Sequence, residues 1–118
     1  MKLAVTVWGN RISPVFDAAS TLLVAEITNK KISGQYYTAF DPESPVDLIH
    51  TLKEHHVTTL VCGAISKTPA GLILEQHIHL IPFVTGNVRH FLDSFALDQT
   101  VGKKHRMPGF KPSRVNVY

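Results

Sequence analysis

The chain has 118 residues and a formal net charge of +3, with 44% hydrophobic and 18% charged residues. This length and composition predict one globular domain and exclude a disordered chain, and no apolar run approaches the roughly 20 residues that span a bilayer. The single cysteine, Cys62, excludes an internal disulfide and suits a reducing cytoplasm, where we expect the protein to be found.

The first third of the chain has the pattern of antiparallel strands. Residues 2–7 predict a buried strand that meets a turn signal at Trp8-Gly9-Asn10, and residues 8–19 predict a loop. Two further strands are predicted at residues 20–28 and about 32–40, joined by a hairpin.

From Ser44 onward, helical and strand patterns alternate. Ser44 and Pro45 form a helix start signal, and this helix is predicted to end near His56. A strand, a helix, a strand and a helix follow at residues 57–62, 68–76, 78–83 and about 87–97. Hairpins followed by right-handed crossovers predict a mixed sheet. We therefore predict an α/β three-layer sandwich with a five-stranded mixed sheet of order 3-2-1-4-5, a ribonuclease H-like topology.

The positive charge is concentrated at the end of the chain. Residues 1–97 hold seven Lys or Arg against eight Asp or Glu, a net charge of −1, whereas residues 98–118 hold five basic residues and one acid, a net charge of +4. We therefore predict a folded domain over residues 1–99 and a basic tail over residues 100–118. Such a tail is typical of a solvated segment, and it can also hold an anion or nucleic acid.

Ligands of an open α/β sheet bind beyond the carboxyl ends of the parallel strands. Three loops are expected to meet at that edge, at residues 8–19, 62–68 and 85–87. The last two lead into helix N-termini, whose free N–H groups favour anions, and Gly63 and Gly86 would let a ligand approach the backbone. These residues predict an anion-binding edge, although tight turns and helix caps explain the same loops.

Few residues offer metal or catalytic chemistry. Cys62, near a helix N-terminus, is either a thiol of lowered pKa that ligates a soft metal or a small core residue. The seven histidines form no His-x-x-x-His pattern and there is no Cys-x-x-Cys pattern, so we interpret the histidines as structural. The first and fourth predicted strands carry no acid, so the carboxylate cluster of a two-metal nuclease is missing.

Several motifs, in their order and spacing, resemble the dinitrogenase iron-molybdenum cofactor biosynthesis family. They are the segment from Lys2 to Ala19, Cys62-Gly-Ala-Ile65 with the Ala70-Gly71-Leu72 helix, Pro82 to Val88, and Arg106-Met-Pro-Gly109. The resemblance covers most of residues 1–110. Many members carry Ser-x-His-Phe-Gly in the first loop, where this chain has Ser13-Pro14-Val15-Phe16-Asp17.

The resemblance implies a ribonuclease H-like domain that binds or carries an iron-sulfur or iron-molybdenum cluster without catalysing a reaction. Its implied partners are the metallocluster and a cofactor-assembly protein, with no membrane. Cys62 is the implied metal ligand, and the implied cofactor-binding residues are Ser13, Phe16, Asp17, Cys62, Gly63, Ala64, Thr85 and Gly86.

Two alternatives to a carrier stay open. One is a regulatory module that binds a small anion or nucleotide at the same edge without metal. The other is a nucleic-acid-binding protein that acts through residues 103–118. The carrier hypothesis depends on Cys62 being accessible at the edge, and not enclosed by aliphatic side chains.

Overall fold

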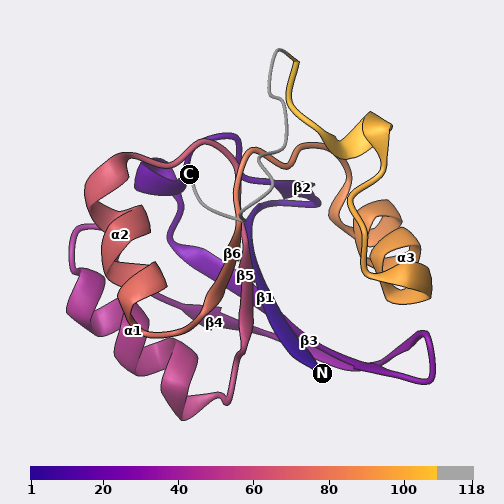
Figure 1. Cartoon of the computed structure of the whole chain (residues 1–118), viewed down its shortest axis with the longest axis horizontal. Helices are drawn as coiled ribbons and strands as arrows, with labels where there is room; N and C mark the ends of the chain where they lie inside the picture. The colour runs from indigo at the N-terminus through magenta and orange to yellow at the C-terminus, as the bar shows by residue number, and fades with distance from the viewer. Residues whose placement is uncertain (109–118) are drawn as a thin grey trace.

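The computed structural model describes residues 1–108 and consists of one mixed sheet between two layers of helices (Figure 1). The strands are β1 (Lys2–Trp8), β2 (Arg11–Ile12), β3 (Thr21–Thr28), β4 (Lys31–Ala39), β5 (Thr59–Val61) and β6 (His79–Ile81). The helices are α1 (Pro45–Glu54), α2 (Lys67–Glu75) and α3 (Val88–Asp98), with short 3-10 helices η1 (Phe16–Ala18) and η2 (Lys103–His105). None of the helices in this part of the chain is long and apolar enough to cross a bilayer.

The sheet order is β4-β3-β1-β5-β6, which confirms the predicted order of the five main strands. β3 pairs antiparallel with β1 and β4, whereas β5 pairs parallel with β1 and β6. The short β2 was not expected. It pairs with the end of β1 through a two-residue turn, in which Gly9 has a φ of +63°. The ribonuclease H-like label for this topology stays a prediction.

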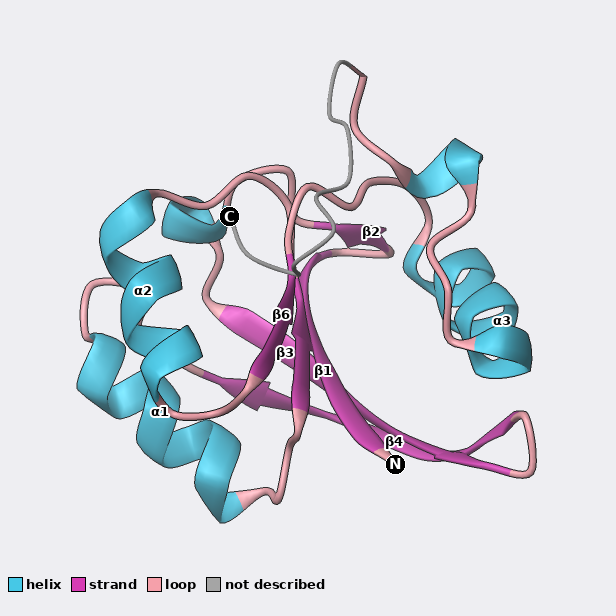
Figure 2. Cartoon of the chain, in the orientation of Figure 1, coloured by secondary structure: helices cyan, strands magenta, loops and turns pink. Residues whose placement is uncertain are grey.

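Figure 2 shows α1 and α2 on one face of the sheet and α3 on the other. The predicted start of α1 is confirmed, because Asp47 N donates to Ser44 Oγ over 3.3 Å and Pro45 is the first helical residue. α3 is capped in the same way by Asn87, whose Oδ1 accepts from His90 N over 3.0 Å. α2 begins without a side-chain cap at Ser66.

Each face of the sheet has its own apolar core. Alternation along β1 directs Ala4 to the core under α1 and α2, and Leu3 and Val5 to the core under α3. The predicted apolar stripe of α3 packs entirely into the core. Its residues are all buried: Val88, Phe91, Leu92, Phe95 and Ala96.

The chain after α3 returns to the domain. Thr85 N donates to the carbonyl of His105 over 2.8 Å, and Met107 N donates to the carbonyl of Phe83 over 3.0 Å. The His105 ring is buried, with its Nδ1 3.1 Å from the Thr85 carbonyl, and it packs against Phe91 in a T-shaped arrangement with 5.5 Å between ring centroids. This part of the predicted tail is therefore fixed to the domain through its backbone and the His105 ring, while Lys103, Lys104 and Arg106 remain exposed. The rest of that tail, residues 109–118, lies outside the described residues.

Candidate functional site

The three loops predicted to meet at the carboxyl ends of the strands do meet. We call them the first loop (residues 9–20), the second loop (residues 62–66) and the third loop (residues 82–87), and together the binding edge. Ala64 N donates to the Pro14 carbonyl over 2.9 Å, and Phe16 N donates to the Ala64 carbonyl over 2.8 Å. These bonds join the first loop to the second.

The third loop is bonded to both of the others. Ile12 N donates to the Gly86 carbonyl over 2.9 Å, and Phe83 N donates to the Gly63 carbonyl over 2.9 Å. The backbone groups of the three loops thus bond largely to one another, which leaves fewer amides for a ligand than the sequence indicated.

The two glycines serve contacts within the protein. A Cβ on Gly63 would clash with the carbonyl oxygens of Ser13 and Pro14, so the glycine makes room for the first loop. Gly86 has a φ of +114°, and a Cβ there would lie 3.0 Å from His105 Nδ1. The expectation that these glycines leave space for a ligand is wrong, because protein atoms occupy that space.

Cys62 is fully buried in the core under α1 and α2. Burial raises the pKa of its thiol far above the ordinary value, and the nearby carboxylate of Asp17 raises it further. The expectation of an accessible thiol with a lowered pKa is therefore wrong, and so is the form of the carrier hypothesis that depends on an exposed Cys62 as the ligand. Desolvation outweighs any effect of the neighbouring helix N-terminus on this pKa. Cys62 is therefore a small core residue, which was the alternative interpretation of the sequence.

A second buried polar group lies beside Cys62. Val5 of β1 is opposite Val61 of β5, so Thr6 and Cys62, one residue further along each strand, are neighbours on the same face. Thr6 is fully buried and its Oγ1 has no hydrogen-bond partner among the described residues. The first loop is bonded to β1 at this point, since Ser13 N donates to the Thr6 carbonyl over 2.9 Å.

The predicted binding residues differ in exposure. Ser13, Phe16, Cys62 and Gly63 are buried, with Phe16 packed on Phe40 at 5.7 Å between ring centroids. Asp17 is exposed, and the half-buried residues are Ala64, Thr85 and Gly86. The first group can position the binding edge, and only the second group can touch a ligand in this conformation.

The charge on the binding edge is positive. Its loops, the first residue of α2 and the segment after α3 expose five cationic side chains against the single carboxylate of Asp17, counted over residues 1–108. These cations are Arg11, Lys67, Lys103, Lys104 and Arg106. Arg106 joins them because it bridges to Val84 of the third loop. Such a surface attracts anions and contains no carboxylate cluster for metal-ion catalysis.

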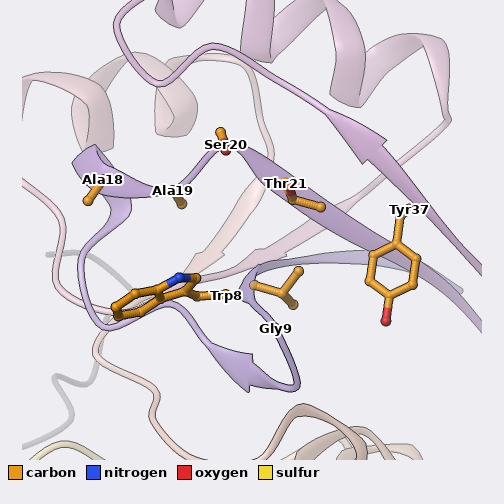
Figure 3. Close-up of a pocket in the computed structure, with 8 residues that line it drawn as sticks. Trp8, Gly9, Ala18, Ala19, Ser20, Thr21 and Tyr37 are labelled. Carbon is orange, nitrogen blue, oxygen red and sulfur yellow. The ribbon is translucent and has the colours of Figure 1, made fainter.

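Two features of this region were not predicted. The His105 ring is buried and holds the segment after α3 against the third loop. The basic composition of this segment gives no indication of a buried residue. Trp8 and Tyr37 flank a hollow of about 560 Å³ beside the first loop (Figure 3). Trp8 is 74% exposed, and its position at a Trp-Gly-Asn turn was the sequence feature that could have indicated this exposure.

The fold and this surface define a small α/β domain with an anion-attracting edge. The chain belongs to the dinitrogenase iron-molybdenum cofactor family, which matches residues 1–97. This confirms the resemblance stated from the sequence motifs. Among curated proteins, none matches the chain.

Solved structures share the fold. The crystal structure of PH0822 superposes with a TM-score of 0.73 at 16% identity, over 81% of this chain and 90% of that one. MJ0327 from Methanocaldococcus jannaschii, provisionally described as a dinitrogenase, gives a TM-score of 0.65 at 17% identity, over 86% and 92%. TM1290 from Thermotoga, provisionally described as a NifB protein, gives 0.64 at 12% identity, over 92% and 98%.

Proposed function

We propose that the protein is a non-enzymatic carrier of an iron-sulfur or iron-molybdenum cluster, bound at the binding edge. The observation that carries the proposal is membership, over residues 1–97, in the dinitrogenase iron-molybdenum cofactor family. The cluster is cargo here, since a carrier takes it up and passes it to a cofactor-assembly protein. Catalysis is not part of the proposal.

The charge of the binding edge supports anionic cargo. Metal-sulfur clusters with thiolate or carboxylate ligands carry net negative charge, and Arg11, Lys67 and Arg106 are exposed around the three loops. The start of α2 adds backbone donors, because its first N–H groups have no side-chain cap at Ser66. The N-terminus of α3 contributes less, since Asn87 caps it.

Direct ligation is a separate step in this proposal. No three His, Cys, Asp or Glu side chains within residues 1–108 lie close enough together to hold a metal ion. Where relatives carry His in the first loop, this chain has the exposed Val15. Cys62 reaches cargo only when the first loop lifts away from Gly63. We therefore propose that charge and backbone amides hold the cargo first, with Cys62 as ligand only in an opened state.

A regulatory module for a small anion or nucleotide is the second candidate. The observation that favours it is the combination of an exposed cationic edge with a buried thiol. Such a module needs Lys67 and the amides of α2 but no sulfur ligand. It predicts that phosphate compounds raise the melting temperature and that chelators have no effect.

The test is anaerobic purification followed by reconstitution with iron and sulfide, with iron and molybdenum analysis and visible absorption. The carrier proposal predicts bound metal and charge-transfer bands that weaken in the double variant Arg11→Ala/Lys67→Ala. Lys53→Ala is the matched control, because its side chain is exposed and bonds Gln76, away from the three loops. Protein that takes up no iron and is instead stabilised by phosphate supports the second candidate and refutes the first.

Cys62→Ser separates charge binding from ligation. Loss of absorption with retained metal uptake indicates that Cys62 ligates the cargo in an opened state. Unchanged spectra show that the exposed edge suffices. The control for folding is the thermal melting temperature of each variant.

A further inference from the structure

Trp8 and Arg11 form an exposed pair where β1 ends. They are directly opposite each other in the pairing of β1 with β2, so their side chains project from the same side of this short hairpin. Trp8 is 74% exposed, and Arg11 is exposed as well. The two-residue turn between them, with Gly9 at a φ of +63°, fixes the distance between the two strands. The hairpin therefore presents a large flat ring beside a guanidinium group.

The third loop holds this hairpin in place. Arg11 bridges to Asn87, and Val88 N donates to the Asn10 carbonyl over 2.9 Å. A ring on a hairpin bonded in this way loses little conformational freedom when a ligand binds it. A single exposed apolar side chain is ordinary in a folded protein. What distinguishes Trp8 is therefore the chemistry of the surface around it.

Exposed cations lie on both sides of the hairpin. Lys67 is the first residue of α2, and three more cations lie on the segment after α3: Lys103, Lys104 and Arg106. Figure 1 shows the start of α2 on one side of β2 and the segment after α3, in yellow, on the other. Within residues 1–108, neither these side chains nor Arg11 form an ion pair with a carboxylate. The positive charge is thus spread along the binding edge, which favours an extended polyanion over a single small anion.

The hollow that Trp8 lines has a different chemistry from the cations. It has a volume of about 560 Å³, and none of the residues that line it carries a charge. Two of them, Ser20 and Thr21, bring hydroxyl groups, which can donate to and accept from the edge of a heterocyclic base. A neutral planar ring fits this environment, whereas an anion finds no counter-charge there. A neutral aromatic part and a cationic part therefore lie side by side on this surface.

We propose that Trp8 and the cations of the binding edge bind single-stranded nucleic acid. Unpaired bases stack on exposed aromatic rings, and lysine and arginine neutralise the phosphates between them. Trp8 stacks on one base, Arg11 contacts the adjacent phosphate, and the cations on either side contact phosphates further along the strand. A duplex keeps its bases paired and offers none to Trp8. This function is separate from cargo transport and needs neither metal nor Cys62.

The number of cations sets the expected strength and salt dependence. Neutralising about three phosphates of a single strand gives a slope of about −2 in the logarithm of the affinity against the logarithm of the salt concentration. Binding of this kind, without base readout, has a dissociation constant on the order of 1–100 µM near physiological salt. Stacking of one base on Trp8 accounts for about 5- to 100-fold of that affinity.

The test is a titration of a dye-labelled oligothymidylate of about 20 nucleotides with the full chain, followed by fluorescence anisotropy at several salt concentrations. Trp8 is the only tryptophan, so quenching of its emission reports stacking at this surface directly. Trp8→Ala should weaken binding by about 5- to 100-fold and leave the salt slope unchanged. Trp8→Phe keeps a flat ring and should retain part of the lost affinity. Arg11→Ala should reduce the magnitude of the salt slope by about 0.7.

Lys31→Ala is the matched control for charge, because Lys31 is exposed at the hairpin between β3 and β4, at the end of the sheet away from the binding edge. It should bind the oligonucleotide like the wild type. Absence of binding at low salt overturns the proposal, and so does an affinity that Trp8→Ala leaves unchanged. A duplex of the same length that binds as tightly as the single strand overturns it, because charge alone then explains the binding. Equally tight binding of thymidine monophosphate overturns the extended strand as the ligand.

Discussion

Gly63→Ala tests whether the first loop is held by close backbone contact with the second. The added Cβ would meet the carbonyl oxygens of Ser13 and Pro14, which are backbone atoms and cannot turn aside as a flexible side chain could. The first loop must then move away from the second. This displaces the two hydrogen bonds that join them, Ala64 N to the Pro14 carbonyl and Phe16 N to the Ala64 carbonyl.

The magnitude follows from these contacts. Each lost backbone bond costs about 0.5–1.5 kcal/mol, and overpacking at a tight site costs about 1–3 kcal/mol. The free energy of unfolding should therefore fall by about 2–6 kcal/mol, which at about 4 °C per kcal/mol for a domain of this size lowers the melting temperature by about 8–24 °C. Urea denaturation and thermal melting followed by circular dichroism measure both quantities.

The matched control is Gly71→Ala in α2. A Cβ at Gly71 meets no atom within 4 Å, so the substitution only replaces glycine with a better helix former. It should raise the free energy of unfolding by about 0.5–1 kcal/mol. The reasoning is refuted if Gly63→Ala is as stable as the wild type, or if both variants lose the same stability.

Three further predictions concern buried groups. Thr6→Val removes a buried hydroxyl that has no partner within residues 1–108 and should raise the free energy of unfolding in urea by about 1 kcal/mol; a loss of stability would contradict the orphaned hydroxyl. Cys62 should react with a thiol dye far more slowly in the native protein than in urea, because burial raises the pKa of its thiol; equal rates would show an exposed sulfur. His105→Ala should lower stability by about 2–4 kcal/mol and speed trypsin cleavage at Lys103 and Lys104, as gel electrophoresis over time would show. Cleavage at the wild-type rate would mean that the ring does not anchor this segment.

The sheet could be predicted from the sequence because its signals are local and agree with one another. The capping pair Ser44 and Pro45, the periodic apolar stripe of α3 and the short buried strands each indicated one element. The right-handed crossover rule then left few topologies. β2 was missed because two residues are too short for any hydrophobic pattern, although Gly9 was the available turn signal.

The location of the binding edge was predicted correctly, but the burial of the groups that form it was not. Gly63 indicates that something approaches the backbone closely, and the sequence cannot say whether this is a ligand or another loop. The burial of Cys62 involves Phe16, which packs in the same core and comes from a loop almost fifty residues earlier. Pairings at such separation leave no local signal, and the same is true of His105, which belongs to η2 and packs against the third loop.

Because Cys62 is buried, binding of the cargo at the exposed cations can be distinguished by experiment from ligation by Cys62. Lifting residues 14–18 breaks the two bonds to Ala64 and exposes Phe16, which costs about 3–6 kcal/mol. Cys62 is then exposed in about one molecule in 10² to 10⁴, and its apparent affinity for a soft metal falls by that factor. Binding at the exposed cations carries no such penalty. The native labelling rate of Cys62, divided by the rate in urea, gives this population directly. A ratio well below 10⁻⁴ would leave charge as the only means of capture, whereas a ratio near 10⁻² would make ligation after capture accessible at equilibrium.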